Sequence, residues 1–240
     1  NGDSVILRAE FDRPDFITHY KNHLFLGYSV GSVINSSLGE PLEYITSTGA
    51  GEISFGSTVT GLMTAAATSL VIFGQTRIDY LTGSSSSDFV TQPLTEESGA
   101  DAYSAQFMNQ PVYLDDAGIR SLQTTSAFGD WRAGSLTQAV EPLMRAKRES
   151  SANVAASVLI RGKDQYRLFW NDGTGITLYN GRKQPETMPF KLPIEVFCAC
   201  SGEVEAGRGE RIFVGAADGY VYEMERGLSF DGEAIPAYIR

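Results

Sequence analysis

The stretch RIFVGAADGYVYEM, Arg211 to Met224, has the pattern of a β-hairpin. Apolar residues alternate with other residues on both sides of an Ala-Asp-Gly turn, as expected for two half-buried strands joined by a tight reversal. The pattern occurs five times in the chain. The five hairpins are NHLFLGYSVGSVINSS from Asn22, TSLVIFGQTRIDYLTG from Thr68, QPVYLDDAGIRSLQTT from Gln110, QYRLFWNDGTGITLYN from Gln165 and ERIFVGAADGYVYEME from Glu210.

The hairpins recur with a regular spacing. Their first strands end at Gly27, Gly74, Asp115, Asn171 and Gly215, which are 47, 41, 56 and 44 residues apart. An apolar segment precedes each hairpin: FITHY from Phe16, GLMTAA from Gly61, SAQFMN from Ser104, ASVLIR from Ala156 and IEVFCACS from Ile194. Each unit is therefore a three-strand meander with room for a fourth strand in the polar segment that follows. Four antiparallel strands in about 40 to 50 residues are typical of a propeller blade.

We therefore expect an all-β fold, a β-propeller of five or six four-stranded blades that forms a single domain over residues 1–240. A β-sandwich or a pair of smaller β domains is the alternative, but turn signals in a sandwich recur every 8 to 12 residues without a longer period. A sixth blade would form if DSVILRAEFDRP, from Asp3, paired with LSFDGEAIPAYIR, from Leu228. The first residue is not Met and the last residues look like a strand, so we expect the chain to be part of a longer polypeptide.

The 56-residue interval contains a predicted helical insertion near residues 135–149. The segment SLTQAVEPLMRAKRESSAN, Ser135 to Asn153, begins with a Ser-x-x-Gln capping box and has basic residues toward its end. Its apolar residues recur at helical spacing: Leu136, Val140, Leu143 and Met144. Pro142 would interrupt a helix that began at the capping box, so the helix could instead start there, with proline in its first turn.

Composition and charge narrow the classes of function. With 42% hydrophobic and 20% charged residues the chain has the composition of a globular protein, and no apolar run approaches the ~18 residues that span a bilayer. Neither membrane insertion nor a secretory leader is indicated. The net charge of −10 argues against tight nucleic-acid binding, which needs clustered Lys and Arg. It is compatible with a surface past which DNA slides without sticking.

The metal-binding residue types give no site. Cys198 and Cys200 lie one residue apart in the apolar run IEVFCACS, so a strand would place both thiols on the same face, and we expect them to be buried. A disulfide between them would be strained. The only histidines, His19 and His23, flank the turn of a predicted hairpin. We therefore expect no metal and no cofactor, since no third and fourth ligand stand at a familiar spacing.

Catalytic motifs are likewise missing, and we assign no catalytic residue. Asp115 and Asp116 would face opposite sides of a strand, and DDAG is ordinary turn chemistry. The sequence NDGTG, residues 171–175, lacks the ligand spacing of an EF-hand, and Trp170 precedes the aspartate rather than following it as in the Asp-box turns of sialidase propellers. No nucleophile elbow, P-loop or dinucleotide fingerprint occurs. The chain is predicted not to be an enzyme.

The remaining notable features have simple interpretations. GSSSSD, residues 83–88, is expected to be a flexible surface loop, with a phosphorylation or ligand site as the alternative. Tyr103, Trp131 and Tyr238 could stack on sugars, but single aromatic residues are more often packing residues. We interpret Asp218 and Gly219 in the opening hairpin as turn residues rather than ligands.

Four stretches together resemble a known family. They are LFLGYSVGSVINSSLGE, GLMTAAATSLVIFGQTRIDYLTG, PVYLDDAGIRSL and ERGLSFDGEAIPAYIR. In pattern and order they resemble the propeller region of tail nozzle, or tail tube, proteins of short-tailed phages. The resemblance covers residues 16–240. This chain is shorter than members of that family generally are.

The resemblance implies a virion component, assembled in the host cytoplasm. Its subunits would form a homo-oligomeric ring, usually a hexamer, and would contact adaptor and fibre proteins. The ring would form part of the channel through which DNA is ejected, without binding the DNA specifically. Two alternatives stay open. A carbohydrate-binding or sialidase-like propeller would require three arginines converging on a pocket with a Tyr and a Glu, and a host-derived adaptor propeller would bind a peptide.

Overall fold

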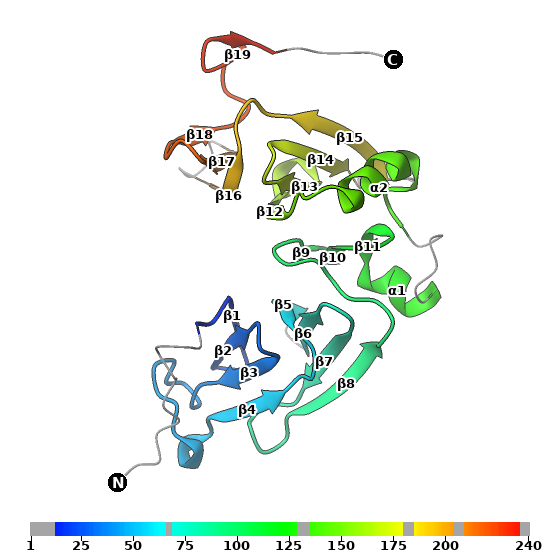
Figure 1. Ribbon diagram of the computed structural model, residues 1–240. Coiled ribbons are helices and arrows are strands. Elements are labelled where there is room, and N and C mark those ends of the chain that lie inside the picture. Colours follow the sequence, from blue (N-terminus) through cyan, green and yellow to red (C-terminus); the bar gives the residue numbers. More distant parts are fainter. Residues whose placement is uncertain (1–12, 66–68, 129–134, 180–184, 204–208, 236–240) are drawn as a thin grey trace. The chain divides into compact units, whose positions relative to one another are not determined.

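The computed structural model describes residues 13–65, 69–128, 135–179, 185–203 and 209–235. The chain divides into two compact units, Asn1–Gln138 and Ala139–Arg240. Both consist mainly of antiparallel sheets whose strands follow one another in chain order (Figure 1). The expectation of an all-β chain built from repeated meanders is confirmed.

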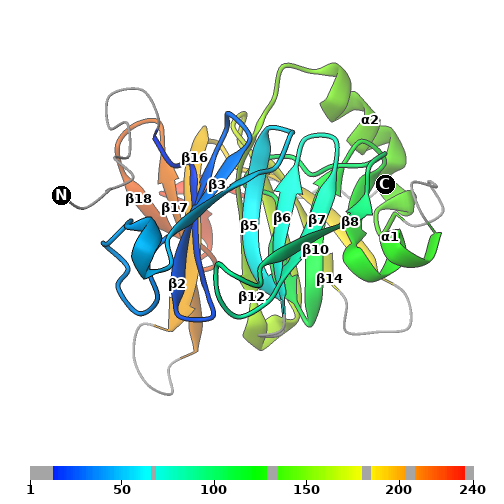
Figure 2. The same cartoon turned by 90° about the horizontal axis from the view of Figure 1, so that it is seen from below.

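The described residues of the first unit form three sheets. The first sheet runs β1-β2-β3-β4 and the second β5-β6-β7-β8, while the third has only three strands, in the order β11-β10-β9. In Figure 2, β5, β6 and β7 lie side by side. The strands are β1 (Phe16–Tyr20), β2 (His23–Tyr28), β3 (Ser32–Asn35), β4 (Gly51–Ser54), β5 (Val59–Ala65), β6 (Ser69–Gly74), β7 (Ile78–Thr82), β8 (Val90–Thr95), β9 (Gln106–Met108), β10 (Gln110–Asp115) and β11 (Gly118–Ser121).

The second unit contains one four-stranded sheet, β12-β13-β14-β15, one three-stranded sheet, β16-β17-β18, and a short hairpin, β19-β20. The four-stranded prediction thus holds for three of the five larger sheets in the described part of the chain. The hairpin falls within LSFDGEAIPAYIR, but most of its predicted partner DSVILRAEFDRP, residues 3–12, lies outside the described residues. The strands are β12 (Val154–Ile160), β13 (Gln165–Trp170), β14 (Thr174–Tyr179), β15 (Glu186–Lys191), β16 (Val196–Glu203), β17 (Glu210–Ala216), β18 (Val221–Glu223), β19 (Ser229–Phe230) and β20 (Glu233–Ala234).

The second strand of a sheet supplies side chains to two cores, as β6 shows. Leu70 and Ile72 point into a cluster shared with Phe25 of the first sheet. Val71 and Phe73 point the other way, into a cluster shared with Tyr113 of the third sheet. All four β6 side chains are fully buried. The sheets of the first unit therefore pack face to face, with a separate apolar core between each neighbouring pair.

Three of the sheets have a β-bulge in their first strand. The register shifts between Val59 and Gly61 in β5, between Val154 and Ala156 in β12, and between Val196 and Cys198 in β16. In each case a valine opens the strand and the extra residue follows it. A bulge bends its strand and increases the local twist. Its recurrence at one position is a sign of structural repetition that the sequence spacing alone does not reveal.

In the described residues the third sheet has no fourth strand, and other segments take its place. After β11 the chain enters helix α1 (Leu122–Phe128) instead of an outer strand. The edge of β11 is covered further along the chain, where the backbone N–H of Leu136 donates to the carbonyl of Ile119. The Thr137 hydroxyl accepts from the N–H of Ile119. Sequence analysis had predicted neither α1 nor this edge contact.

The predicted helical insertion is confirmed, with a later start. Helix α2 spans Glu141–Glu149 and has Pro142 in its first turn. The capping-box prediction was wrong, because the Ser135 side chain interacts with Thr137 and α2 has no side-chain cap. Lys147, near the end of α2, donates to Asp172 at 2.5 Å and lies over the ring of Trp170. Within the described ranges, none of the helices is long and apolar enough to span a membrane.

Candidate functional site: a pocket in the second unit

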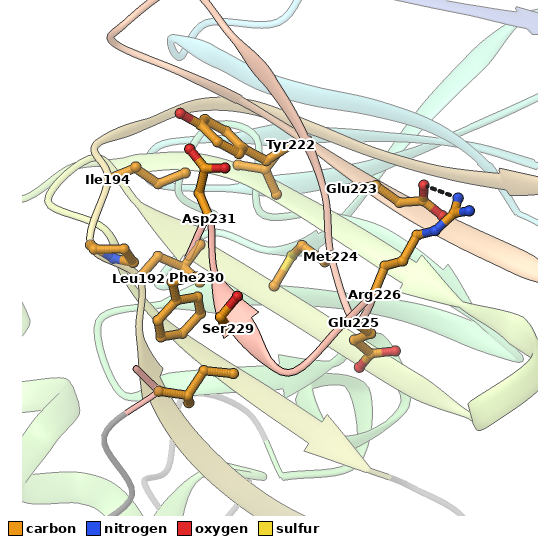
Figure 3. A pocket seen from close by; sticks show the side chains of 14 residues that line it. Leu192, Ile194, Tyr222, Glu223, Met224, Glu225, Arg226, Ser229, Phe230 and Asp231 are labelled. Atoms are coloured by element: carbon orange, nitrogen blue, oxygen red, sulfur yellow. Dashed lines mark hydrogen bonds and ion pairs between the residues drawn. The ribbon is translucent and has the colours of Figure 1, made fainter. Parts of the chain in front are cut away.

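The second unit contains a pocket of about 530 Å3 (Figure 3). Its apolar wall comes from the β15–β16 connection, where Leu192 and Ile194 lie, and from Val214 on β17. Met224 and Phe230 line it from the segment that leads into β19. Its volume falls in the range usual for sites that bind small molecules or side chains, about 300 to 1,000 Å3. The pocket is therefore a candidate binding site.

Charged groups at one end of the pocket are paired with one another. Glu223 accepts from Arg226 at 2.8 Å and lies 3.4 Å from Arg211. Glu225 is held by Lys163 and by Arg167, which is largely buried in β13. Although burial alone would raise it, the hydrogen bonds from Lys163 and Arg167 lower the pKa of Glu225. The acidic and basic side chains at this end of the pocket therefore neutralise one another.

The other end of the pocket is acidic. The hydroxyl of Tyr222 donates to Asp218 at 2.6 Å, and that hydrogen bond raises the pKa of Tyr222 to about 12. The negative charge of Asp231 contributes to the same shift, and Figure 3 shows Asp231 beside Tyr222 and Ile194. Among the described residues, no cation lies within ion-pair distance of Asp231 or Asp218. The pocket thus has an uncompensated acidic end on an apolar floor.

The pocket does not have the arrangement that would favour a sialidase-like site. It has a tyrosine, glutamates and nearby arginines, but the arginines point at two different glutamates rather than at one open position. This set of side chains is therefore not arranged for glycoside cleavage.

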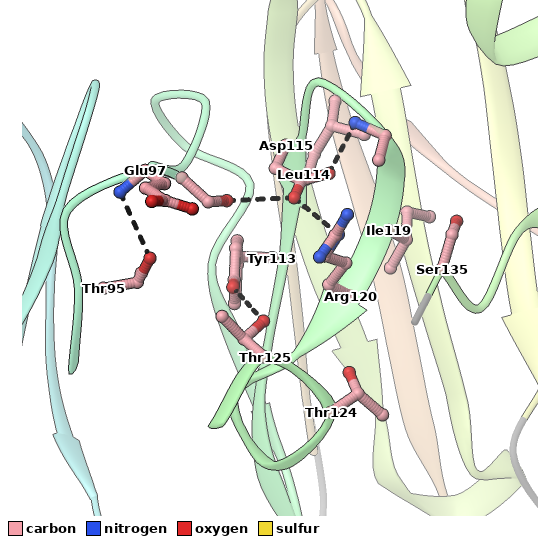
Figure 4. A network of polar contacts seen from close by, with 12 residues as sticks. Thr95, Glu97, Tyr113, Leu114, Asp115, Ile119, Arg120, Thr124, Thr125 and Ser135 are labelled. Atoms are coloured by element: carbon pink, nitrogen blue, oxygen red, sulfur yellow. Dashed lines mark hydrogen bonds and ion pairs between the residues drawn. The ribbon is translucent and has the colours of Figure 1, made fainter. Parts of the chain in front are cut away.

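A second polar cluster lies in the first unit, in the hairpin that contains Asp115 and Asp116 (Figure 4). Nε of Arg120 lies 2.6 Å from Oδ2 of Asp115, and their side chains are 0% and 2% exposed. Asp115 also accepts from the Ser98 hydroxyl and from the N–H of Ala117. Asp116, in contrast, is exposed. The two aspartates are not paired carboxylates, and Asp115 is part of a buried ion pair that sequence analysis missed.

The signal for this ion pair was present in the sequence. Arg120 lies within a strand that otherwise looks buried, PVYLDDAGIRSL, and a fully buried arginine requires an acidic partner. The partner is the aspartate at the other side of the hairpin turn.

Asp101 is a third carboxylate near this hairpin. Withdrawal from water, followed by the negative charges of Asp116 and Asp115, raises the pKa of Asp101 from its ordinary value of 3.8 to about 6. Its backbone is fixed, because its N–H donates to Leu114 and its carbonyl accepts from Ser104. Its carboxylate therefore lies where the negative charges of Asp116 and Asp115 act on it.

The D101N variant is expected to be more stable than the wild type at pH 7.5. Because the folded-state pKa lies above the ordinary value, the stabilising contribution of Asp101 is complete below about pH 4 and is lost as the pH rises through 6. Part of the Asp101 surface stays in contact with solvent, which screens the effect, so we expect a gain of about 1 kcal/mol that disappears at pH 4. Urea unfolding at both pH values measures it. D116N is the control and should give a smaller gain, and an equal gain for D101N at both pH values would refute the assignment.

The two cysteines lie on the exposed face of β16. Cys198 and Cys200 are both free and exposed, so the prediction that they are buried was wrong. The bulge at the start of β16 places them opposite Gly215 and Phe213, on the face away from the core residues Ile212 and Val214. Among the described residues there is no cluster of three metal-binding side chains. The absence of a metal stays a prediction.

The histidines flank a hairpin turn as predicted. The turn residues Lys21 and Asn22 have positive φ and join β1 to β2. His19 is exposed, whereas His23 is buried and its Nδ1 lies 2.6 Å from the Ser36 carbonyl. His23 therefore has a structural contact within its own sheet.

The GSSSSD loop and Tyr103 both make local contacts in the structure. In the GSSSSD loop, Asp88 accepts hydrogen bonds from the backbone N–H groups of Ser84 and Ser85, which lower its pKa to about 2. The ring of Tyr103 lies 5.5 Å from that of Phe16. Trp131 and Tyr238 lie outside the described residues.

In two hairpin turns an aspartate accepts a hydrogen bond from the backbone N–H two residues further along the chain. Asp172 of NDGTG accepts from the N–H and hydroxyl of Thr174. Asp218 accepts from the N–H of Tyr220 in the same way. The interpretation of both as turn chemistry agrees with these contacts, although Asp218 also borders the pocket through Tyr222.

Comparison with known proteins identifies the fold. No family model matches the chain, and no curated protein matches it in sequence. A chain of the mitotic checkpoint complex superposes with a TM-score of 0.52 at 12% identity, covering 88% of this chain and 63% of that one. The β-propeller domain of Cps50 (Swd1) from Myceliophteria thermophila superposes with a TM-score of 0.55 at 10% identity, covering 88% and 69%. The chain has a β-propeller fold.

These similarities concern architecture only. At 10% and 12% identity they show how the strands are arranged and carry no activity or partner to this chain. The chain spans less than two thirds of the length of the checkpoint-complex protein. The five larger sheets described above are therefore propeller blades, three with four strands and two with three.

Proposed function

We propose that the chain is a non-enzymatic structural protein of a phage tail, in the nozzle or tube, that forms part of the channel for DNA ejection. The type of assembly is inferred from the resemblance of residues 16–240 to the tail nozzle or tail tube proteins of short-tailed phages. The structural support is that the arginines near the pocket and in the buried cluster are each paired with an acidic side chain of the same unit. Such pairs stabilise blades and leave no convergent catalytic set among the described residues.

Charge supports the second part of the proposal. The chain carries a net charge of −10. In a ring of such subunits an acidic lumen would repel the phosphate backbone over a Debye length of about 8 Å at physiological salt. DNA would then pass without adhering to the wall, which is what an ejection channel requires.

The proposal predicts an oligomeric ring that does not retain DNA. Mass photometry and electron microscopy of the purified chain, alone and with candidate adaptor proteins, should show rings, with six subunits as the expected number. Duplex DNA should not be shifted in a gel at 50 mM salt, where electrostatic binding is strong. A chain that stays monomeric in all these mixtures, or that binds duplex DNA, would contradict the proposal. A fluorogenic sialoside assay and a glycan array should both be blank.

A further inference from the structure

Among the strands of the described residues, none pairs with the outer edge of β18, which lies next to the pocket. β18 is the last strand of a three-stranded blade, whereas the blades β1–β4, β5–β8 and β12–β15 each have a fourth strand. The Ala216 N–H donates to the Tyr220 carbonyl and the Met224 N–H donates to the Ile212 carbonyl. Because hydrogen-bonded pairs alternate along an antiparallel ladder, the backbone groups of Val221 and Glu223 point away from β17. In the described part of the chain no strand pairs with this edge.

The edge and the pocket are suited to the same kind of ligand. A strand added beside β18 would direct every second side chain to the face where Tyr222 and Met224 line the pocket. Val221, on the edge, is 71% exposed. An unpaired edge with exposed apolar residues is a template for strand addition.

The acidic end of the pocket indicates the charge of the ligand. Asp231 has no cationic partner among the described residues and lies beside Tyr222, whose pKa is raised partly by Asp231. A lysine or arginine side chain directed into the pocket would supply the missing positive charge, while its aliphatic stem would cover the apolar floor formed by Ile194 and Phe230. An acidic side chain in the same position would be repelled.

We propose that the outer edge of β18 and the adjacent pocket bind an extended peptide segment of a partner protein, with alternating apolar and polar residues and one basic side chain that pairs with Asp231. This inference does not depend on the proposed role in a phage tail. The backbone of the segment would complete the blade, and its basic and apolar side chains would fill the pocket.

The test uses an acetylated, fluorescein-labelled peptide, TVTKTV, whose second, fourth and sixth residues would face the pocket. Fluorescence anisotropy with the full chain should show saturable binding that weakens with added salt. The matched peptide TVTETV should bind at least tenfold more weakly, which corresponds to about 1.4 kcal/mol. Equal binding of the two peptides, or no binding of TVTKTV at 1 mM protein, would overturn the proposal.

Three variants locate the site. D231N should weaken the binding of TVTKTV about tenfold. D164N is its matched control, because Asp164 is also an exposed aspartate of this unit with positive φ, 50° against 49° for Asp231, and it lies outside the pocket. V221P removes an outward backbone donor from the edge and should weaken binding of both TVTKTV and an uncharged peptide, TVTLTV. Circular dichroism confirms that each variant is folded. Equal effects of D231N and D164N, or an unchanged affinity of V221P, would refute the assignment.

Discussion

Replacing Arg120 with methionine is expected to lower the free energy of unfolding by about 3 to 5 kcal/mol, the usual cost of breaking a buried ion pair. The arginine is fully buried and its Nε lies 2.6 Å from Asp115. Methionine fills much of the space but leaves the aspartate charged, buried and without its cation. Urea unfolding followed by circular dichroism measures the loss.

Two further variants show whether the loss comes from the charge. In R145M an exposed pair with Glu149, at 3.0 Å, is broken, and the change should stay within about 0.5 kcal/mol. The double variant R120M/D115L removes both buried charges and should be more stable than R120M alone. If R120M unfolds like the wild type, or if the double variant is less stable than R120M, then the pair does not have the role assigned here.

Replacing Gly173 with alanine is expected to cost about 2 to 4 kcal/mol, because two separate constraints oppose a side chain at this turn. The residue has φ 79°, and an added Cβ would lie 2.2 Å from the Ile194 carbonyl oxygen and 2.8 Å from that of Leu192. Both obstacles are backbone atoms, which cannot rotate away. Leu192 also donates its N–H to the Gly173 carbonyl, so the substitution should displace the β15–β16 connection that forms one wall of the pocket.

Gly162 provides the matched control for this experiment. It belongs to the same unit, an added Cβ would meet no heavy atom within 4 Å, and its φ is not positive. G162A should therefore be neutral or slightly stabilising, by up to about 1 kcal/mol. Equal thermal stability of G173A and G162A would show that the close approach at Gly173 is not rigid.

The hairpins could be predicted from the sequence because the residues that specify a hairpin are close together in the chain. The strand FITHY, for example, coincides with β1, and the two strands of ERIFVGAADGYVYEME correspond to β17 and β18. Alternating apolar residues and turn residues act over only a few positions, so they can be seen without knowledge of the rest of the chain. The period of the hairpins then indicated blades.

The features that sequence analysis missed depend on contacts between distant residues. Helix α1 follows β11 where a fourth strand was expected, and Leu136 and Thr137 contact the edge of β11 from outside the hairpin. The cysteines are exposed because a bulge in β16 sets which face they share, and an apolar run gives no sign of a bulge. The pocket was missed for the same reason, since its walls come from separate turns and strands.

Because both faces of β6 are buried, this strand tolerates insertions and deletions poorly. A one-residue insertion in this strand would exchange the faces of Leu70, Val71, Ile72 and Phe73, and so would disrupt two apolar cores at once. The outer strands and connections carry no such constraint, and it is there that the third blade replaces a strand with a helix. Insertions and deletions in homologous sequences should therefore accumulate outside the second strand of each blade, which can be checked in an alignment before any protein is made.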